Sequence, residues 1–121
     1  MGFELMTNND KYFDHCINLI SSDDPMKFEE GYHLLLPRVN EYGDKIAELI
    51  VAEKSSDILS KLVELLGECN EPRYIPIFKD LLTNEIHDVV SLSLTALENL
   101  PSKDGEEIAN QFRSKNPKWL E

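Results

Sequence analysis

The sequence predicts an all-α fold, built as a short solenoid of about three helical hairpins followed by a C-terminal helix. Three observations support this prediction. Apolar residues coincide three times when the sequence is shifted by 31 residues, and a repeat of roughly 20–50 residues is typical of stacked helical proteins. Inside each repeat the apolar residues follow the period of a helix. The chain shows no convincing alternation of apolar and polar residues of the kind that indicates a strand.

Six sets of aligned residues carry the repeat, and every member of each set is apolar or aromatic. Such a pattern is hard to obtain by chance in a chain that is 41% hydrophobic. Because one helical pair cannot bury its apolar side alone, the repeats are expected to stack against one another. The six sets are Leu19, Ile50 and Leu81; Ile20, Val51 and Leu82; Phe28, Leu59 and Val90; Tyr32, Val63 and Leu94; Leu34, Leu65 and Ala96; and Leu35, Leu66 and Leu97.

The first hairpin is expected to consist of helices 10–20 and 25–36. Residues 21–24 form the turn between them and include Ser and Asp, whose side chains accept hydrogen bonds from the first N–H groups of a helix. Pro37 cannot continue a helix, so the second helix should stop or kink there. Gly43 ends the irregular segment that follows.

The remaining helices repeat the same organisation. Ser, Asn and Asp again fill the turns within hairpins, where they cap the helix that follows. Pro72 and Pro101 mark the boundaries between later units. The last helix matches the apolar pattern of the first half of a unit, which indicates a half-repeat. The expected helices are 44–54, 57–69, 73–83, 87–100 and 104–115.

The length of 121 residues is typical of one domain. We therefore expect a single helical-repeat domain over residues 1–121. Its units are predicted at about 10–43, 44–72 and 73–103, with the half-unit at 104–115.

Residues 65–76, which read LLGECNEPRYIP, resemble the junction between two HEAT-like repeats of the short variety. The second helix of such a repeat ends in Leu-Gly, an acidic-Pro-Arg turn follows, and the next first helix opens with an aliphatic residue and Pro. Asp57 and Asp88 match the turn aspartate of the family. The resemblance extends well over 44–115 and weakly over 10–43.

The chain departs from the HEAT-like pattern at two informative positions. Leu59 and Val90 stand where the family usually has an arginine two residues after the turn aspartate. What the resemblance implies is a protein-binding scaffold whose second helices line one face. It does not imply a reaction.

Acidic residues outnumber basic ones by 23 to 12, which gives a net charge of −11. This balance argues against nucleic acid and anionic membranes as partners, because both attract basic surfaces. Three explanations of the negative charge remain: a basic protein partner, the binding of cations, or a role in solubility only. The apolar runs are far shorter than the ~20 residues of a membrane span, and the N-terminal residues lack the basic and apolar regions of a signal peptide. We expect a cytoplasmic protein.

No arrangement of side chains in the sequence predicts a catalytic residue, a cofactor site or a metal site. His15, His33 and His87 have no His or Cys partner at i+3 or i+4, the spacing of a zinc pair on a helix. His15 and Cys16 fall in apolar positions of the repeat and are expected to pack in the core. Cys69 lies at a helix C-terminus, which does not activate a thiol. The chain is therefore not expected to be an enzyme.

Acidic residues on and near the second helices are the candidate protein-binding residues. If these helices stand side by side, residues at equal register form three rows across them. The rows are Glu30, Lys61 and Leu92; His33, Glu64 and Thr95; and Pro37, Glu68 and Asn99. These rows carry more acid than base and would attract a basic protein. The same residues could instead serve solubility alone. The predicted set is Glu29, Glu30, His33, Tyr42, Glu64, Glu68 and Glu71.

Two aromatic residues are candidate anchors for a partner, because aromatic side chains dominate many interfaces. Tyr42 lies in the irregular segment between the first two units, and Trp119 lies near the C-terminus. For Trp119 we favour a second interpretation, in which the residue folds back to cap the last helix.

Two functions from different classes are compatible with these observations. The first is a bacterial immunity protein that binds and neutralises a cognate toxin. Many toxins aimed at nucleic acids are basic, and an acidic inhibitor can mimic the charge of their substrate. The second is a HEAT-like adaptor or assembly-factor scaffold without a toxin partner. A metal-dependent or thiol enzyme ranks third.

Overall fold

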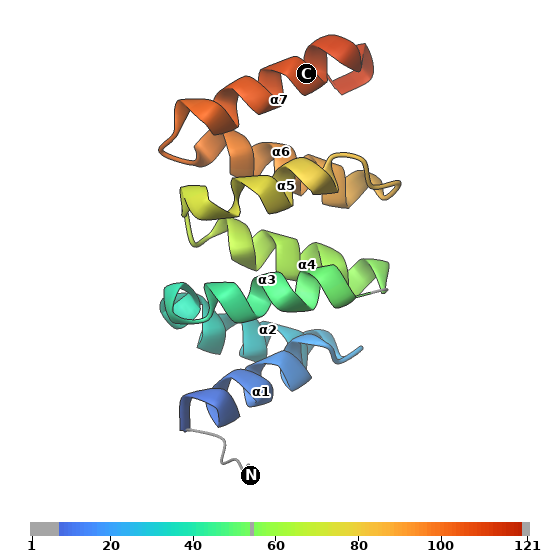
Figure 1. Cartoon of the computed structure of the whole chain (residues 1–121). Helices are drawn as coiled ribbons and strands as arrows, with labels where there is room; N and C mark the ends of the chain where they lie inside the picture. Colours follow the sequence, from blue (N-terminus) through green and yellow to red (C-terminus); the bar gives the residue numbers. More distant parts are fainter. Residues whose placement is uncertain (1–7, 54, 120–121) are drawn as a thin grey trace. The chain divides into compact units, whose positions relative to one another are not determined.

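The computed structural model describes residues 8–53 and 55–119, and over these residues the fold is all-α, as predicted, with seven α-helices and no strand (Figure 1). Each expected helix is present. The helices are α1 Asn8–Ile20, α2 Pro25–Leu35, α3 Gly43–Ala52, α4 Ser56–Gly67, α5 Ile75–Leu81, α6 His87–Asn99 and α7 Lys103–Lys115. Three short 3₁₀ segments accompany them: η1 Leu36–Glu41, η2 Pro72–Tyr74 and η3 Pro117–Trp119.

The chain divides into two compact units, one up to Tyr42 and one from Gly43 onward. This division falls at the predicted end of the first repeat. The first unit holds α1, α2 and η1, and the second unit holds α3 to α7 with η2 and η3.

In the first unit α1 and α2 pack at very short range. A Cβ atom added to Gly31 of α2 would lie 2.7 Å from the Cys16 carbonyl oxygen and 2.7 Å from the Leu19 Cβ of α1. Only a residue without a side chain fits at this crossing, which lets Ile20 and Leu35 become fully buried. The predicted stop at Pro37 is also confirmed, because α2 ends at Leu35 and the chain continues as η1.

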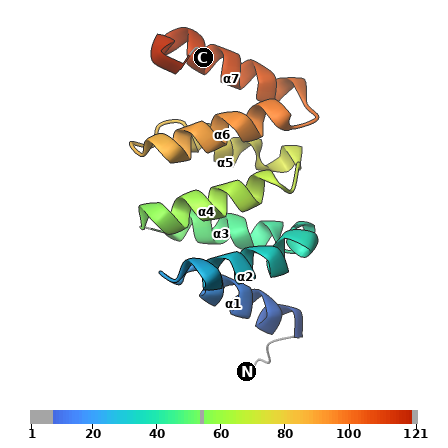
Figure 2. The ribbon, with the colours of Figure 1, turned by 180° about the vertical axis from the view of Figure 1, so that it is seen from behind.

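In the second unit α4 and α6 form the centre of the packing. Helix α4 contacts α3 and α6, and α6 also contacts α5 and α7. Figure 2 shows α4 and α6 on one face of this unit, with α3 and α5 behind them. Five leucines of these two central helices are 0–1% exposed: Leu62, Leu65, Leu66, Leu94 and Leu97.

The crossing of α6 and α7 depends on a second glycine. A Cβ atom added to Gly105 would lie 2.5 Å from the carbonyl oxygen of Leu97. Ala109, one helical turn further along α7, is fully buried. Small residues on the inner side of α7 therefore set how closely this last helix approaches α6.

The 31-residue register holds for the second helices of the repeats. Leu35, Leu66 and Leu97 form one predicted column, and each is 0% exposed. The first helices follow a different register. The buried pair Cys16 and Ile20 of α1 recurs 30 residues later in α3, as Ile46 and Ile50. It recurs again after 32 residues as Phe78 of α5 and Leu82, the C-cap of α5.

Two predictions about the first helices are therefore wrong. Val51, which the repeat aligned with Ile20 and Leu82, is 81% exposed. His15, which was expected in the core, is exposed, while its neighbour Cys16 is buried as predicted. Successive residues of a helix point about 100° apart. A difference of one residue in the length of the segment before a helix therefore places a residue that the repeat assigns to the core on the surface.

Candidate protein-binding groove

A groove of about 190 Å³ lies between α4 and α6 in the second unit. Both helices lie on the face of this unit that Figure 2 displays. The groove is lined by Val63, Glu64, Gly67 and Glu68 from α4 and its C-cap, and by Leu92, Thr95, Ala96 and Asn99 from α6.

The floor of the groove is apolar and its rims are polar. Val63 is fully buried and Ala96 is 7% exposed, whereas Glu64 and Glu68 are exposed on the α4 side. Thr95 and Asn99 are exposed on the α6 side and form a neutral rim. On each rim the two polar residues are four positions apart, so they lie on the same side of the helix about one turn apart. The groove thus has one acidic rim and one neutral rim along an apolar floor.

Two small residues line the groove where α4 and α6 approach each other. Gly67 is the last residue of α4, and a Cβ atom added to it would lie 3.4 Å from the Cβ of Ala96. Larger side chains at these two positions would fill the groove.

The structure brings together the α4 and α6 residues that the repeat predicted to be neighbours. Glu64 and Glu68 line the same groove as Thr95 and Asn99. The apolar floor was missed, because the repeat placed Val63 and Ala96 only in the core. The change from Leu65 to Ala96 within one column was the signal that space opens at this point.

The other predicted binding residues lie elsewhere. Glu71 is half-buried at the N-cap of η2, outside the groove lining. Glu29, Glu30 and His33 are exposed on α2, in the first unit. Their role in binding stays a prediction.

Tyr42 is 3% exposed, which corrects the expectation of an exposed aromatic anchor at this position. Its ring centroid lies 5.1 Å from that of Phe13 and 6.4 Å from that of Tyr12, both on α1. The guanidinium of Arg38 lies 5.5 Å from the Tyr42 ring centroid, and burial raises the pKa of the Tyr42 hydroxyl. The 3₁₀ segment η1 turns this side chain inward, where it closes the aromatic core of the first unit.

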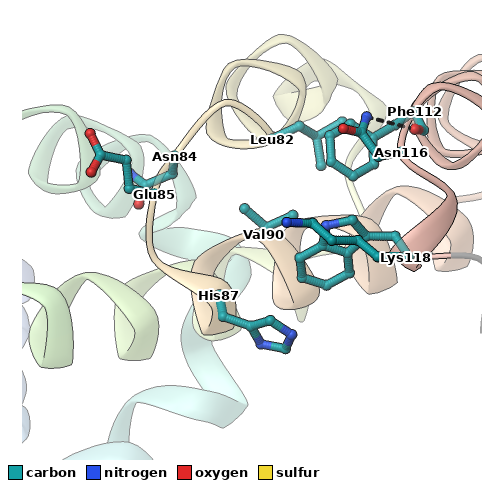
Figure 3. Close-up of a pocket in the computed structure, with 9 residues that line it drawn as sticks. Leu82, Asn84, Glu85, His87, Val90, Phe112, Asn116 and Lys118 are labelled. Carbon is teal, nitrogen blue, oxygen red and sulfur yellow. Dashed lines mark hydrogen bonds between the residues drawn. The ribbon is translucent and has the colours of Figure 1, made fainter.

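Trp119 folds back onto α6 and α7, as the favoured interpretation predicted. Its ring centroid lies 4.5 Å from that of His87 at the start of α6, and its carbonyl oxygen accepts a 2.7 Å hydrogen bond from Arg113 Nε. A shallow pocket of about 380 Å³ lies beside it (Figure 3). In this pocket the Asn116 side-chain amide donates to the Phe112 carbonyl oxygen at 2.9 Å.

Both thiols are buried, and burial lowers their reactivity. Cys69 is 5% exposed, and loss of solvation, with a smaller contribution from Glu71, raises its pKa to about 11. Burial also raises the pKa of Cys16, which is fully buried. Because the thiolate is the nucleophile, both cysteines are expected to be chemically inert in the folded protein.

We expect Cys69 to react with a water-soluble thiol reagent at pH 8 at least about 100-fold more slowly than a free thiol, since a raised pKa depletes the thiolate and burial hinders access. The measurement is the rate of colour release from dithiobis-nitrobenzoate with and without denaturing urea. The Asn110→Cys variant, at an exposed position of α7, is the matched control and should react rapidly. Equal native rates at both positions would contradict the buried environment.

Two further features of the described residues bear on the site. Within residues 8–53 and 55–119, the structure holds no group of three or more His, Cys, Asp or Glu side chains placed to bind a metal ion. None of the helices in the described part of the chain is long and apolar enough to cross a membrane.

Comparison with protein families, with curated proteins and with solved structures found no match to this chain.

Proposed function

We propose that this protein is a non-catalytic binding module that takes a basic protein at the groove between α4 and α6. The observation that carries the proposal is the acidic rim, Glu64 and Glu68, beside an apolar floor in a chain of net charge −11. A negative surface raises the encounter rate with a basic partner. The apolar floor adds contact area that excludes water, as the centres of protein interfaces do.

The most specific form of this proposal is an immunity protein. In this role the chain binds a basic, nuclease-type toxin and covers the surface that would otherwise contact nucleic acid. The excess of 11 negative charges supports the role, because it can imitate the charge of the phosphate backbone. The raised pKa values of Cys16 and Cys69 support a function that does not depend on thiol chemistry.

The test is protection and binding with the product of the gene immediately upstream. That product is expressed with and without this chain, cell survival is scored, and affinity is measured by titration calorimetry. Protection together with tight binding is the expected result. Recovery of an assembly factor from cell extract, with no toxic neighbouring gene product, would replace the immunity role with that of an adaptor. Absence of binding to any basic protein would overturn the proposed function.

Reversing the acidic rim separates binding from stability. We expect the double variant Glu64→Lys, Glu68→Lys to bind a basic partner about 10-fold or more weakly, because positive charges then face each other across the interface. Both residues are exposed, so each change should alter the free energy of unfolding by no more than about 0.5 kcal/mol. Affinity is measured by calorimetry and stability by urea unfolding.

The matched control for the rim reversal is Glu106→Lys with Glu107→Lys. These residues are exposed on α7 and lie outside the groove lining. This variant changes the net charge by the same amount. If both double variants lose affinity equally, general charge and not the groove attracts the partner.

A further inference from the structure

The groove has the dimensions of a site for one side chain. Its volume of about 190 Å³ lies below the range of roughly 300–1,000 Å³ that is typical of pockets for drug-sized molecules. The apolar residues that line the groove are Leu92, Ala96 and Gly67, together with Val63, which is 0% exposed. An aliphatic stem can lie along such a floor, whereas a whole helix needs a broader surface.

The rims offer hydrogen-bond acceptors on both sides of this floor. Glu64 and Glu68 carry carboxylates, which accept hydrogen bonds only. Thr95 and Asn99 stand across from them and carry a hydroxyl and an amide carbonyl, which can also accept. The eight lining residues are apolar, neutral polar or acidic. The matching ligand therefore has an apolar stem and a positively charged head with several donors.

Resting on the proposed function, we infer that the groove receives one arginine side chain of the basic partner. The methylene groups of the arginine lie on the apolar floor, as long cationic side chains do on apolar surfaces. The guanidinium reaches the carboxylates of Glu64 and Glu68 and the oxygen atoms of the opposite rim. Its five N–H donors form a planar fork that suits carboxylates on one side and neutral acceptors on the other.

Lysine satisfies the same charge but fits this site less well. Its ammonium carries three donors on a compact and strongly hydrated centre. It cannot address two carboxylates and the opposite rim together in the planar geometry that guanidinium offers. The groove therefore distinguishes arginine from lysine in a way that long-range attraction does not.

The experiment uses three fluorescein-labelled peptides of twelve residues that are rich in lysine and differ only at one central position. That position is arginine, lysine or citrulline, which has the shape of arginine without its charge. Binding to the full chain is measured by fluorescence anisotropy. We expect the arginine peptide to bind about 10-fold more tightly than the lysine peptide and the citrulline peptide to bind most weakly. The Glu106→Gln, Glu107→Gln variant is the control that retains this order.

A groove-filling variant tests the position of the arginine. Gly67→Leu leaves both carboxylates in place and is expected to abolish the preference for arginine over lysine. Should this variant fail to fold, chemical shift changes in the methyl groups of Val63 and Leu92 on adding the arginine peptide test the same contact. We expect both residues to shift more with the arginine peptide than with the lysine peptide.

The possible results separate the inference from the proposed function. Equal affinity for the arginine and lysine peptides, with loss of both upon Glu64→Lys and Glu68→Lys, would overturn the arginine site and leave the acidic binding surface intact. Failure of every peptide to bind, together with failure of every basic protein, would overturn both. Retained arginine preference in Gly67→Leu would place the recognition outside the groove and overturn the inference alone.

Discussion

Replacing Leu66 by alanine is expected to lower the free energy of unfolding by about 2–5 kcal/mol. Leu66 is 0% exposed and lies in the middle of the packing of the second unit, on the helix that contacts both α3 and α6. The substitution removes buried methyl groups and leaves a cavity that rigid neighbouring helices cannot fill. Because domains of this kind are stable by only about 5–15 kcal/mol, this is a large share of the total.

The measurement is urea unfolding followed by circular dichroism, with Val51→Ala as the matched control. Val51 is 81% exposed on α3 although the 31-residue repeat aligns it with buried residues. Its truncation should change the free energy of unfolding by no more than about 0.5 kcal/mol. If Val51→Ala lowered the free energy of unfolding as much as Leu66→Ala does, Val51 would belong to the core, as the 31-residue repeat predicts, and the packing seen in the structure would be contradicted.

The second large effect is expected at Gly105, where Gly105→Ala should destabilise the protein by about 1–3 kcal/mol. The new Cβ atom would lie 2.5 Å from the Leu97 carbonyl oxygen. That oxygen belongs to the backbone of α6, so the contact is relieved only if α6 and α7 move apart. Alanine favours a helix over glycine by about 1 kcal/mol, which offsets part of the steric cost without cancelling it.

Gly67→Ala is the control, because the same substitution is expected to have the opposite sign. Here the added Cβ would lie 3.4 Å from the Cβ of Ala96, an ordinary packing distance. The helix preference of alanine should then raise the stability by up to about 1 kcal/mol. Thermal unfolding of the two variants is compared with that of the parent chain. A change of the same sign at both positions would contradict the close crossing of α6 and α7.

The groove links these packing effects to binding. The stability of the protein does not depend on glycine at position 67, since a methyl group fits there. Gly67 nevertheless lines the groove between α4 and α6, where a larger side chain would take up space. Gly105 and Gly31, in contrast, are required where two helices cross at short range. The glycine whose replacement is tolerated is thus the one that lines the proposed site.

Local signals predicted the helices well because short-range interactions determine where helices begin and end. The Asp24 side chain accepts a hydrogen bond from the Met26 N–H at 3.0 Å, and the Ser102 side chain accepts one from the Asp104 N–H at 3.2 Å. These caps satisfy backbone donors that have no partner within the helix. Pro37 ends α2 through its own ring geometry. None of these effects requires knowledge of distant residues.

The candidate site was predictable only in part. The rows of Glu64 with Thr95 and Glu68 with Asn99 follow from the equal register of α4 and α6, which the structure retains. The burial of Tyr42 was not predictable, because it depends on contacts with Phe13 and Tyr12 of another helix. Whether Tyr42 is exposed or buried depends on the direction that η1 takes after α2, and that direction cannot be read from the local sequence.

The sequence by itself determined the all-α class, the seven helices and the neighbouring rows on α4 and α6, because helix period and capping are local and the repeat is regular in the second helices. Only the tertiary structure decided which side of each first helix is buried, as Ile50 and Val51 show. It also decided where a groove opens between α4 and α6, beside Gly67 and Ala96. The physical reason is that the rotation of a helix after an irregular segment, and the distance between two helices, are set by packing against distant side chains.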